Sequence, residues 1–543
     1  MKKFLSLLLT GVMSAMLLAG CGNTANDPGS ASSSTPPAGE EERSITIAQS
    51  ANFSMGFAPG VQSYEATYYM NNFYEGLVEY RDGEYLPCLA TDWVASDDGL
   101  TYTFHLRDDV QFNDGIAFNA EAVKLYFDNM KSVIGTSANY GQLDMLTTEI
   151  TVDDEYTVSF HLSRPYYNVL NDLSMVMPRG ILSAAAFNED GSLNTEYLMT
   201  HTPGTGPYMF ESVNETATEY TFVKNPNYWG EEPDVDRFTV KVIPESKVAA
   251  MRASEVDFIM GSDTLDANSY LELSQVEGIT GVISDFDFVT EFIALNDEVA
   301  PLDDLNVRTA IQMAIDKESI AQNIYSGLRA KADSVMPADM PYCTATVPTP
   351  DYDMDGAIAL LEDSGWVDSN GDGIREKDGQ ALSLKYTYDS GDALNKSLAT
   401  AVKSQLAAVG INVETEGQEM MTWWQEGVAG NYDLIMWNTE QPYTSPHNYF
   451  IPMLSRSPHV PSLPAVEGSD EFLALIEEFQ TTDDSARVQE IFDELLNFDN
   501  DNVLDLPLLF VKDMIVYNTD KIAGYDFSST PMFFDARLIQ PAE

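Results

Sequence analysis

The order of helical and strand patterns in the second half of the chain limits the fold more than any other feature. A helical pattern begins at Asn306, and another covers residues 394–409 and stops at Gly410. A strand pattern follows at residues 411–415, so strands and helices alternate from residue 292 to about residue 499. Such alternation is typical of an α/β unit in which helices cover a sheet.

The first half of the chain is richer in strand patterns. Residues 45–47 open it, and residues 101–106 alternate as a half-buried strand does. His105 lies in this alternation and is interpreted as a strand residue, not as a ligand. Asn119 is the expected cap of a helix that follows. About 500 ordered residues exceed what one core serves, so two or three domains are expected.

The N-terminus has the pattern of an export signal. Lys2 and Lys3 precede an apolar run that ends in Leu-Ala-Gly-Cys at Cys21. The run suits a signal peptide better than a membrane span, which needs roughly 20 apolar residues. The ending is similar to a bacterial lipoprotein signal, which predicts cleavage after residue 20 and acylation of the Cys21 sulfur. Residues 21–43 contain little to bury, and we expect a disordered tether there.

The chain is strongly acidic, with a formal net charge of −58 that becomes −60 when the two lysines of the signal are removed. This charge argues against nucleic acid as a partner, since binding to phosphate depends on Lys and Arg. A solvated acidic surface explains the charge best. Cys88 and Cys343 show no metal-binding spacing, and the sequence leaves open whether they pair.

Several short motifs in the first three fifths of the chain occur in a fixed order. They are FYEGLV at residues 73–78, LATDW at 89–93, SDDGLTYTFHLR at 96–107, VQFNDG at 110–115, TGPY at 205–208, KNPNYWG at 224–230, VRTAI at 307–311 and AIDK at 314–317. Together they resemble the oligopeptide, dipeptide and nickel-type solute-binding proteins of bacterial ABC importers. The resemblance covers essentially all of the chain from Ser44 onward.

This resemblance implies an α/β chain with a two-lobed, periplasmic-binding-protein type II-like fold, an extra N-terminal subdomain and a ligand cleft between the lobes. Lobe I would comprise residues 44–291, with the extra subdomain at about 66–203. Lobe II would comprise residues 292–503, and residues 504–543 would return to lobe I. The two crossing strands are expected near residues 291–295 and 504–511, where apolar strand-like runs occur.

An enzyme is not expected, because the chain contains no GxSxG, HExxH or Walker motif. The resemblance instead implies a receptor that needs no cofactor, acts as a monomer and delivers its ligand to ABC permease membrane subunits. The Cys21 lipid anchor would hold it on the outer side of the cell membrane.

Residues 431–460 carry two of the five histidines and several aromatics, on a short strand followed by a loop rich in Pro, Asn and Ser. Here the chain resembles the nickel-binding branch of the family. The resemblance implies His459 as the metal ligand with His447 supporting it, Trp437 and Tyr443 as ligand contacts, and Arg179 as the group that holds a carboxylate of a nickel chelate. The branch's further Arg and Trp have no match at residues 137–142, where only Tyr140 offers an aromatic wall.

Two other functions remain open. A short peptide is the alternative cargo, although the family's peptide binders place an Asp in this loop and residues 444–447 contain none. A sensory or structural lipoprotein that keeps the fold without transport is the other. Residues 368–374 copy half of a calcium loop, but Gly379 stands where a bidentate Glu is needed, so a turn is the better interpretation.

Overall fold

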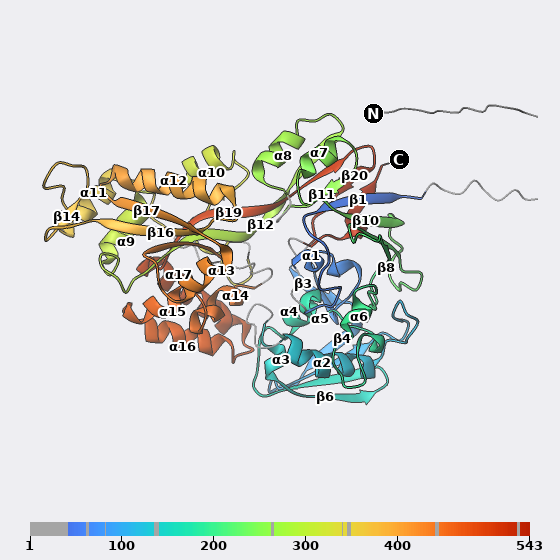
Figure 1. Cartoon of the computed structure of the whole chain (residues 1–543). Coiled ribbons are helices and arrows are strands. Elements are labelled where there is room, and N and C mark those ends of the chain that lie inside the picture. The colour runs from blue at the N-terminus through green and yellow to red at the C-terminus, as the bar shows by residue number, and fades with distance from the viewer. Residues whose placement is uncertain are drawn as a thin grey trace, which may run out of the picture. The chain divides into compact units, whose positions relative to one another are not determined.

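Two long antiparallel strands, β12 (Ile279–Leu295) and β19 (Asp505–Asn518), link the two halves of the fold (Figure 1). The computed structural model describes residues 42–60, 64–81, 83–134, 141–261, 265–338, 340–344, 349–439, 445–528 and 533–542. The predicted signal peptide, Cys21 and nearly all of the predicted tether lie outside these residues, as do Tyr140 and Tyr443. None of the helices in the described ranges is long and apolar enough to cross a membrane.

One sheet is continuous through both halves, in the order β17-β16-β18-β12-β19-β11-β1-β10-β9-β8, with β13 (Ala330–Lys331) added beside β19. We call the part built on β1 and β8–β11 lobe I, and the part built on β16–β18 lobe II. β12 and β19 stay paired from Ile279 opposite Asn518 to Ala294 opposite Asp505, with register shifts between residues 283 and 292. The crossing strands therefore lie where they were predicted, but they are longer.

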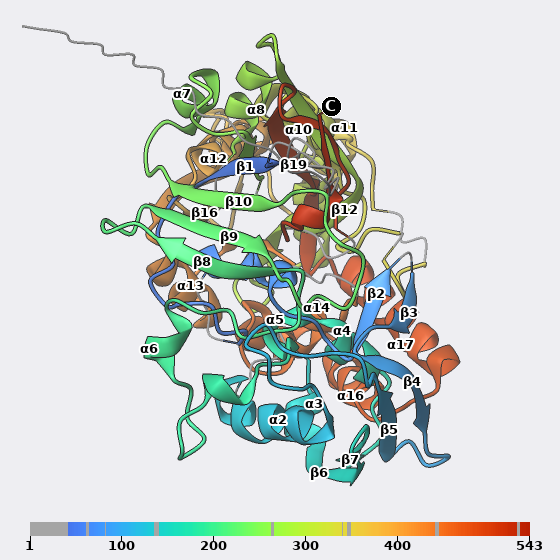
Figure 2. The ribbon, with the colours of Figure 1, turned by 90° about the vertical axis from the view of Figure 1, so that its right-hand side faces the viewer.

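In lobe I, β1 (Ser44–Gln49) lies parallel to β10 (Arg237–Val242) and β11 (Phe258–Ile259). β8 (Tyr208–Val213) and β9 (Glu219–Lys224) extend the sheet antiparallel, as Figure 2 shows. The predicted opening strand is confirmed, since Ile45 and Ile47 are buried. α7 (Lys247–Arg252) and α8 (Ala267–Leu273) contribute to a small apolar core with Ala48 and Val516 of the sheet.

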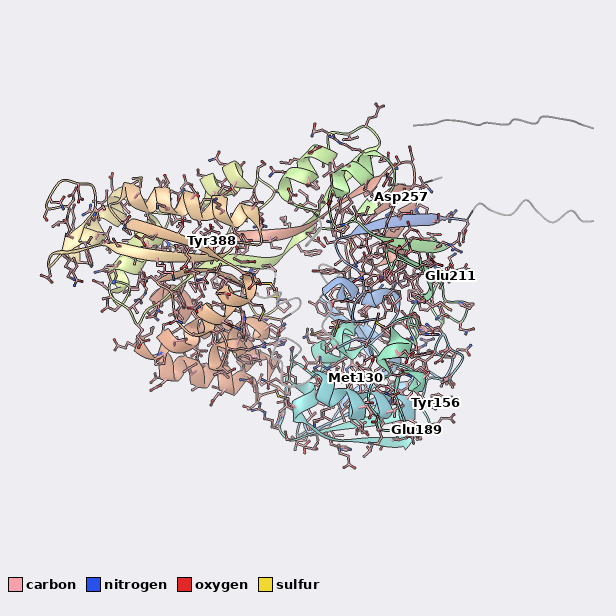
Figure 3. The ribbon with its side chains drawn as sticks, in the orientation of Figure 1. Met130, Tyr156, Glu189, Glu211, Asp257 and Tyr388 are labelled. Carbon is pink, nitrogen blue, oxygen red and sulfur yellow. The ribbon has the colours of Figure 1, made fainter. Side chains whose placement is uncertain are left out.

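The polypeptide between β1 and β8 forms an extra region attached to lobe I. Its four-stranded antiparallel sheet has the order β4 (Ala90–Ala95), β5 (Thr101–Leu106), β7 (Thr157–Leu162), β6 (Thr147–Asp154). The other elements are α1 (Tyr64–Thr67), the hairpin β2 (Val78–Arg81) and β3 (Glu84–Pro87), α2 (Ala120–Ile134), α3 (Leu143–Leu146), α4 (Val169–Ser174), α5 (Val176–Arg179) and α6 (Thr195–Leu198). Figure 3 labels Met130, Tyr156 and Glu189 in this region.

Two predictions for the extra region are confirmed. β5 has the expected alternation, and His105 is an exposed strand residue that contacts the Asp92 carboxylate. The Asn119 side chain accepts a hydrogen bond from the Ala122 amide at 3.0 Å, which satisfies a backbone donor at the start of α2.

Lobe II has a mixed sheet covered by helices on both faces. β16 (Ser383–Asp389) lies parallel to β17 (Asn412–Gln418) and to β18 (Leu434–Asn438), and β18 is antiparallel to β12. One core includes α9 (Leu305–Met313), α10 (Lys317–Ile324), α11 (Met354–Asp363) and α12 (Ala393–Ala408). The other includes α13 (Met420–Val428), α14 (His447–Phe450), α16 (Ser469–Phe479) and α17 (Ser485–Asn502). α15 (His459–Ser462) contacts α13 beside this core.

The expected start of α9 at Asn306 is wrong by one residue. Asp304 is the cap, because its carboxylate accepts the Asn306 amide hydrogen at 3.0 Å, and the helix begins at Leu305. The stop at Gly410 is confirmed. Gly410 has φ +88°, a left-handed conformation that glycine adopts without a Cβ penalty.

The half calcium loop is a turn built on its own side chains. Asp368 accepts hydrogen bonds from the amides of Gly371 and Gly373 at 2.7 and 3.0 Å. β14 (Glu376–Lys377) and β15 (Gln380–Ala381) follow as a small hairpin. The predicted limits of the domains stay predictions, because the main sheet continues through both lobes.

Candidate functional site

The two candidate histidines open two short helices beyond β18. His447 is the first residue of α14 and His459 the first of α15. Pro446 and Pro458 precede them with φ of −73° and −59°, and proline is favoured at helix starts because its φ is already helical. The sequence thus places each imidazole in the first turn of a helix on the same side of lobe II.

His447 is a buried, neutral imidazole with one nitrogen unoccupied. Its ring is 1% exposed. Nδ1 lies 2.9 Å from the Asn168 amide nitrogen and 2.7 Å from Ser445 Oγ. Nε2 has no hydrogen-bond partner within the described part of the chain. Burial, followed by the positive charge of Arg179, lowers the pKa of His447 to about 3, so the ring keeps a lone pair at neutral pH.

This depressed pKa makes the stability of the fold sensitive to acid. The ordinary pKa of histidine is 6.5. As the pH falls, His447 therefore binds a proton near that pH in the unfolded chain but only near pH 3 in the folded chain. The stabilisation by neutral His447 is complete above the unfolded pKa and is lost as the pH falls towards the folded pKa. Between about pH 7 and pH 5, we expect wild type to lose about 2 kcal/mol more unfolding free energy than His447→Gln. Urea denaturation at both pH values measures the difference, and equal losses would contradict it.

His459 is buried to the same degree, but its ring nitrogens face protein partners. Nε2 lies 3.0 Å from Asp505 Oδ1, and Nδ1 lies 3.4 Å from Ser457 Oγ. Burial alone lowers the pKa of His459, but the Asp505 carboxylate outweighs it, so the pKa is raised. With Nε2 bonded to Asp505 and Nδ1 facing Ser457, neither ring nitrogen of His459 offers a lone pair that is unoccupied. The hydrogen bonds therefore favour His447 over His459, the reverse of the predicted order, and metal binding by either stays a prediction.

The surroundings of His459 also leave little room. A cavity of about 10 Å³ lies between His459, Phe292, Trp437 and Tyr449, a volume that holds at most about one water. Trp437 is buried in the lobe II core, and its ring lies 4.2 Å from that of Trp423. The predicted ligand contact by Trp437 stays a prediction.

Arg179 is enclosed by acidic partners. Its side chain is 0% exposed. Nε and one terminal nitrogen donate to Asp144 Oδ2 at 3.0 and 2.5 Å, and the other terminal nitrogen donates to the Asp172 carbonyl at 3.1 Å. Burial lowers the pKa of Arg179, but the charges of Asp144 and Asp172 raise it by a larger amount. The pKa therefore lies above its ordinary value, and the guanidinium stays charged. Its donors are directed at protein groups.

Arg179 also supports the segment next to Tyr140. Its charge partly offsets the effect of burial, which raises the pKa of Asp172 to about 6. The Asp172 carboxylate accepts hydrogen bonds from the amides of Gln142 and Leu143 at 2.9 and 3.0 Å. The predicted role of Arg179 as a direct carboxylate ligand stays a prediction, whereas its contacts show it to be a support for residues 142–143.

Contacts between the extra region and lobe II meet at His447. Asn168 reaches its ring, and Tyr167 OH lies 3.4 Å from Ser445 Oγ. Asn168 was not found by sequence reasoning, since it lies 279 positions from His447 and belongs to no motif. Ser445 is two residues from His447 and could have been suspected from that spacing. These contacts hold the ring from both sides of the junction.

A roomier cavity lies apart from both histidines. It measures about 1090 Å³ and is lined by residues of the β2–β3 hairpin, the 228–234 loop, β12 and the C-terminal segment. Its buried carboxylate, Glu75, already accepts from Thr205 Oγ1 and Trp229 Nε1, each at 2.8 Å. The histidines, of which His447 has an unoccupied nitrogen, therefore define the candidate site.

Comparison with known proteins defines the class. The sequence model of the family described as bacterial extracellular solute-binding proteins, family 5 (middle region), matches residues 84–459. The nickel-binding periplasmic protein of Escherichia coli K12 is 29% identical over 452 residues, covering 82% of this chain and 84% of that protein. The dipeptide-binding protein of the same organism is 27% identical over 430 residues, covering 74% and 76%. The crystal structure of NikA from Brucella suis in complex with Fe(III)-EDTA has a TM-score of 0.86 at 27% identity, covering 92% of this chain and all of that one.

The fold is thus a two-lobed type II periplasmic-binding-protein fold with an extra N-terminal region. The chain belongs to family 5 of the bacterial extracellular solute-binding proteins. It is an ABC-importer binding protein that acts outside the cytoplasm, and its relatives are named for nickel or peptides. Any metal or chelate is transported ligand in the nickel-binding relatives, not a resident cofactor.

Proposed function

We propose that this protein captures nickel, bound to a small organic chelator, for an ABC importer. The observation that carries the proposal is the buried, neutral His447 ring with an unoccupied Nε2. Imidazole nitrogen is a suitable nickel ligand, and the chelator would fill the other coordination positions. Similarity to the nickel-binding protein of Escherichia coli supports the same cargo.

The neighbours of His447 suit this role. For Nε2 to bind a metal, Nδ1 must keep its proton and donate it. Ser445 Oγ at 2.7 Å is an acceptor for that proton, and a rotated Asn168 amide would present its oxygen to the same nitrogen. Ligating histidines commonly have their second nitrogen held in this way, which fixes the orientation of the ring.

Release and capture would use movement of the lobes about β12 and β19. Register shifts between residues 283 and 292 interrupt the ladder between the lobes, and bulges of this kind bend strands locally. Because Asn168 belongs to the extra region and His447 to lobe II, lobe closure and ring orientation would be coupled. Hinge closure is the usual mode of proteins with this architecture.

A short peptide is the second candidate cargo. Similarity to the dipeptide-binding protein of Escherichia coli favours it. The loop chemistry favours nickel, because residues 444–447 contain no acid to pair with a peptide amino group.

The remaining parts of the proposal follow the sequence. Cys21 would carry the lipid anchor on the outer side of the cell membrane, and the mature monomer would meet ABC permease subunits there and perform no chemistry itself. Tyr140 would form an aromatic wall beside the chelator, and Tyr443 would be a further ligand contact.

Calorimetric titration of the mature protein tests the cargo. Nickel alone, nickel with L-histidine, and a dipeptide mixture are added in parallel. The proposal expects binding of the nickel–histidine complex, whereas heat with dipeptides alone would replace nickel by peptide as the cargo.

A further inference from the structure

An arginine with unoccupied donors lies at the end of lobe II where its parallel strands finish. β16 and β17 end at Asp389 and Gln418, and β18 ends at Asn438. Glu291 of β12 is the register partner of Asn438 and forms an ion pair with Arg329. In α/β sheets, ligands bind beyond the carboxyl ends of the parallel strands. The Glu291–Arg329 pair therefore lies at the edge where a ligand is expected.

Arg329 is held in place without using all of its donors. Its guanidinium carbon lies 4.0 Å from the centre of the Tyr325 ring, and one terminal nitrogen contacts Glu291. Within the described residues, Nε and the second terminal nitrogen form no hydrogen bond. The side chain is 18% exposed, in contrast to the fully enclosed Arg179. Stacking on an aromatic ring fixes the plane of a guanidinium, which prepares its free edge for a second carboxylate.

The charge of Glu291 acts on two tyrosine hydroxyl groups that lack partners among the described residues. Tyr325 OH and Tyr386 OH are buried and have no hydrogen-bond partner among the described residues. Burial, with the Glu291 charge adding to it, raises the pKa of both phenols, so they remain protonated donors. Buried polar atoms normally have partners. Tyr325, whose ring lies against the Arg329 guanidinium, therefore brings an unpaired donor to this ion pair.

The acidic charge of the chain also supports a role for Arg329 in binding an anion. The chain carries 86 acidic and 28 basic residues, so its field repels anions. A ligand with a carboxylate therefore needs a specific cationic partner. Arg179 directs its donors at Asp144 and Asp172, which leaves Arg329 as the better equipped arginine.

We propose that Arg329 binds the carboxylate of the cargo through its free guanidinium edge. Glu291 holds the other side of the guanidinium and limits its strength as an anion receptor. The inference rests on the proposed function, because it defines the cargo further as a complex whose chelator bears a carboxylate. The further arginine of the nickel-binding branch has no match at residues 137–142, and under this proposal Arg329 of lobe II supplies that cationic donor.

The test compares two nickel complexes that differ in one group. L-Histidine carries a carboxylate and histamine does not. We expect Arg329→Gln to weaken binding of nickel–L-histidine by about tenfold or more, and that of nickel–histamine by less than about twofold. Arg487→Gln, a charge-matched change on α17 in the same lobe, should leave both affinities unchanged. Because Arg329→Gln leaves Glu291 without its partner, the double variant Glu291→Gln/Arg329→Gln is measured too and should show the same selective loss.

Each outcome separates this inference from the proposed cargo. If wild type binds nickel–histidine and the Arg329 variants bind it equally well, or lose both complexes equally, the inference is overturned and the nickel proposal stands. If wild type binds only dipeptides, the nickel proposal fails, and the inference survives only if Arg329→Gln weakens a dipeptide more than its C-terminal amide. Binding of none of these ligands overturns both.

Discussion

His447→Ala should weaken binding of the nickel–histidine complex by more than about 100-fold, since loss of a metal ligand exceeds the 10- to 100-fold effect of losing its outer partners. The physical reason is that His447 offers an unprotonated, unoccupied Nε2 in a position fixed by Asn168 and Ser445. Calorimetric titration of the variant and of wild type measures the change directly.

His459→Gln is the matched comparison. Its amide can still donate to Asp505, so the buried carboxylate keeps a partner. We expect its nickel–histidine affinity to stay within about threefold of wild type, because His459 is already engaged on both nitrogens. A large loss in His459→Gln together with wild-type affinity in His447→Ala would restore the order predicted from the sequence.

Arg179→Met should destabilise the protein by about 3–5 kcal/mol, because removing one member of a buried ion pair leaves the others uncompensated. Asp144 and Asp172 would both remain buried without their cation. Urea denaturation measures the loss. Arg487→Met, at a partly exposed arginine paired with Glu478, should cost no more than about 1 kcal/mol.

A triple variant separates the support role of Arg179 from a ligand role. Arg179→Met combined with Asp144→Asn and Asp172→Asn removes the uncompensated charges, and we expect it to recover much of the lost stability. If Arg179→Met were as stable as wild type but unable to bind nickel–histidine, Arg179 would be a ligand residue and not a support.

Local patterns in the sequence predicted the elements that local forces decide. The alternation of residues 101–106, the Asn119 cap and the stop at Gly410 each depend on a few neighbouring residues, and each is found. The start of α9 was misplaced by one residue because Asp304 and Asn306 are both good capping residues, and only the backbone direction selects between them. The two-lobed arrangement came from the resemblance to a family.

The chemistry of the candidate site could not be predicted to the same extent. Both histidines were found from the sequence, but their relative value depends on Asn168 and Asp505, which lie 279 and 46 positions away from them. Arg179 was predicted from the sequence to hold a ligand carboxylate. No local pattern indicates that Asp144 and Asp172 form ion pairs with it instead. Contacts between distant positions decide which donor atoms are free, and periodicity contains no information about them.

Diffraction at the nickel absorption edge, from crystals of the mature protein grown with nickel and L-histidine, tests the central claim most directly. We predict an anomalous peak within coordination distance of His447 Nε2, with His459 still bonded to Asp505. A peak on His459, or no peak at either histidine in a protein that binds the complex in solution, would contradict the account.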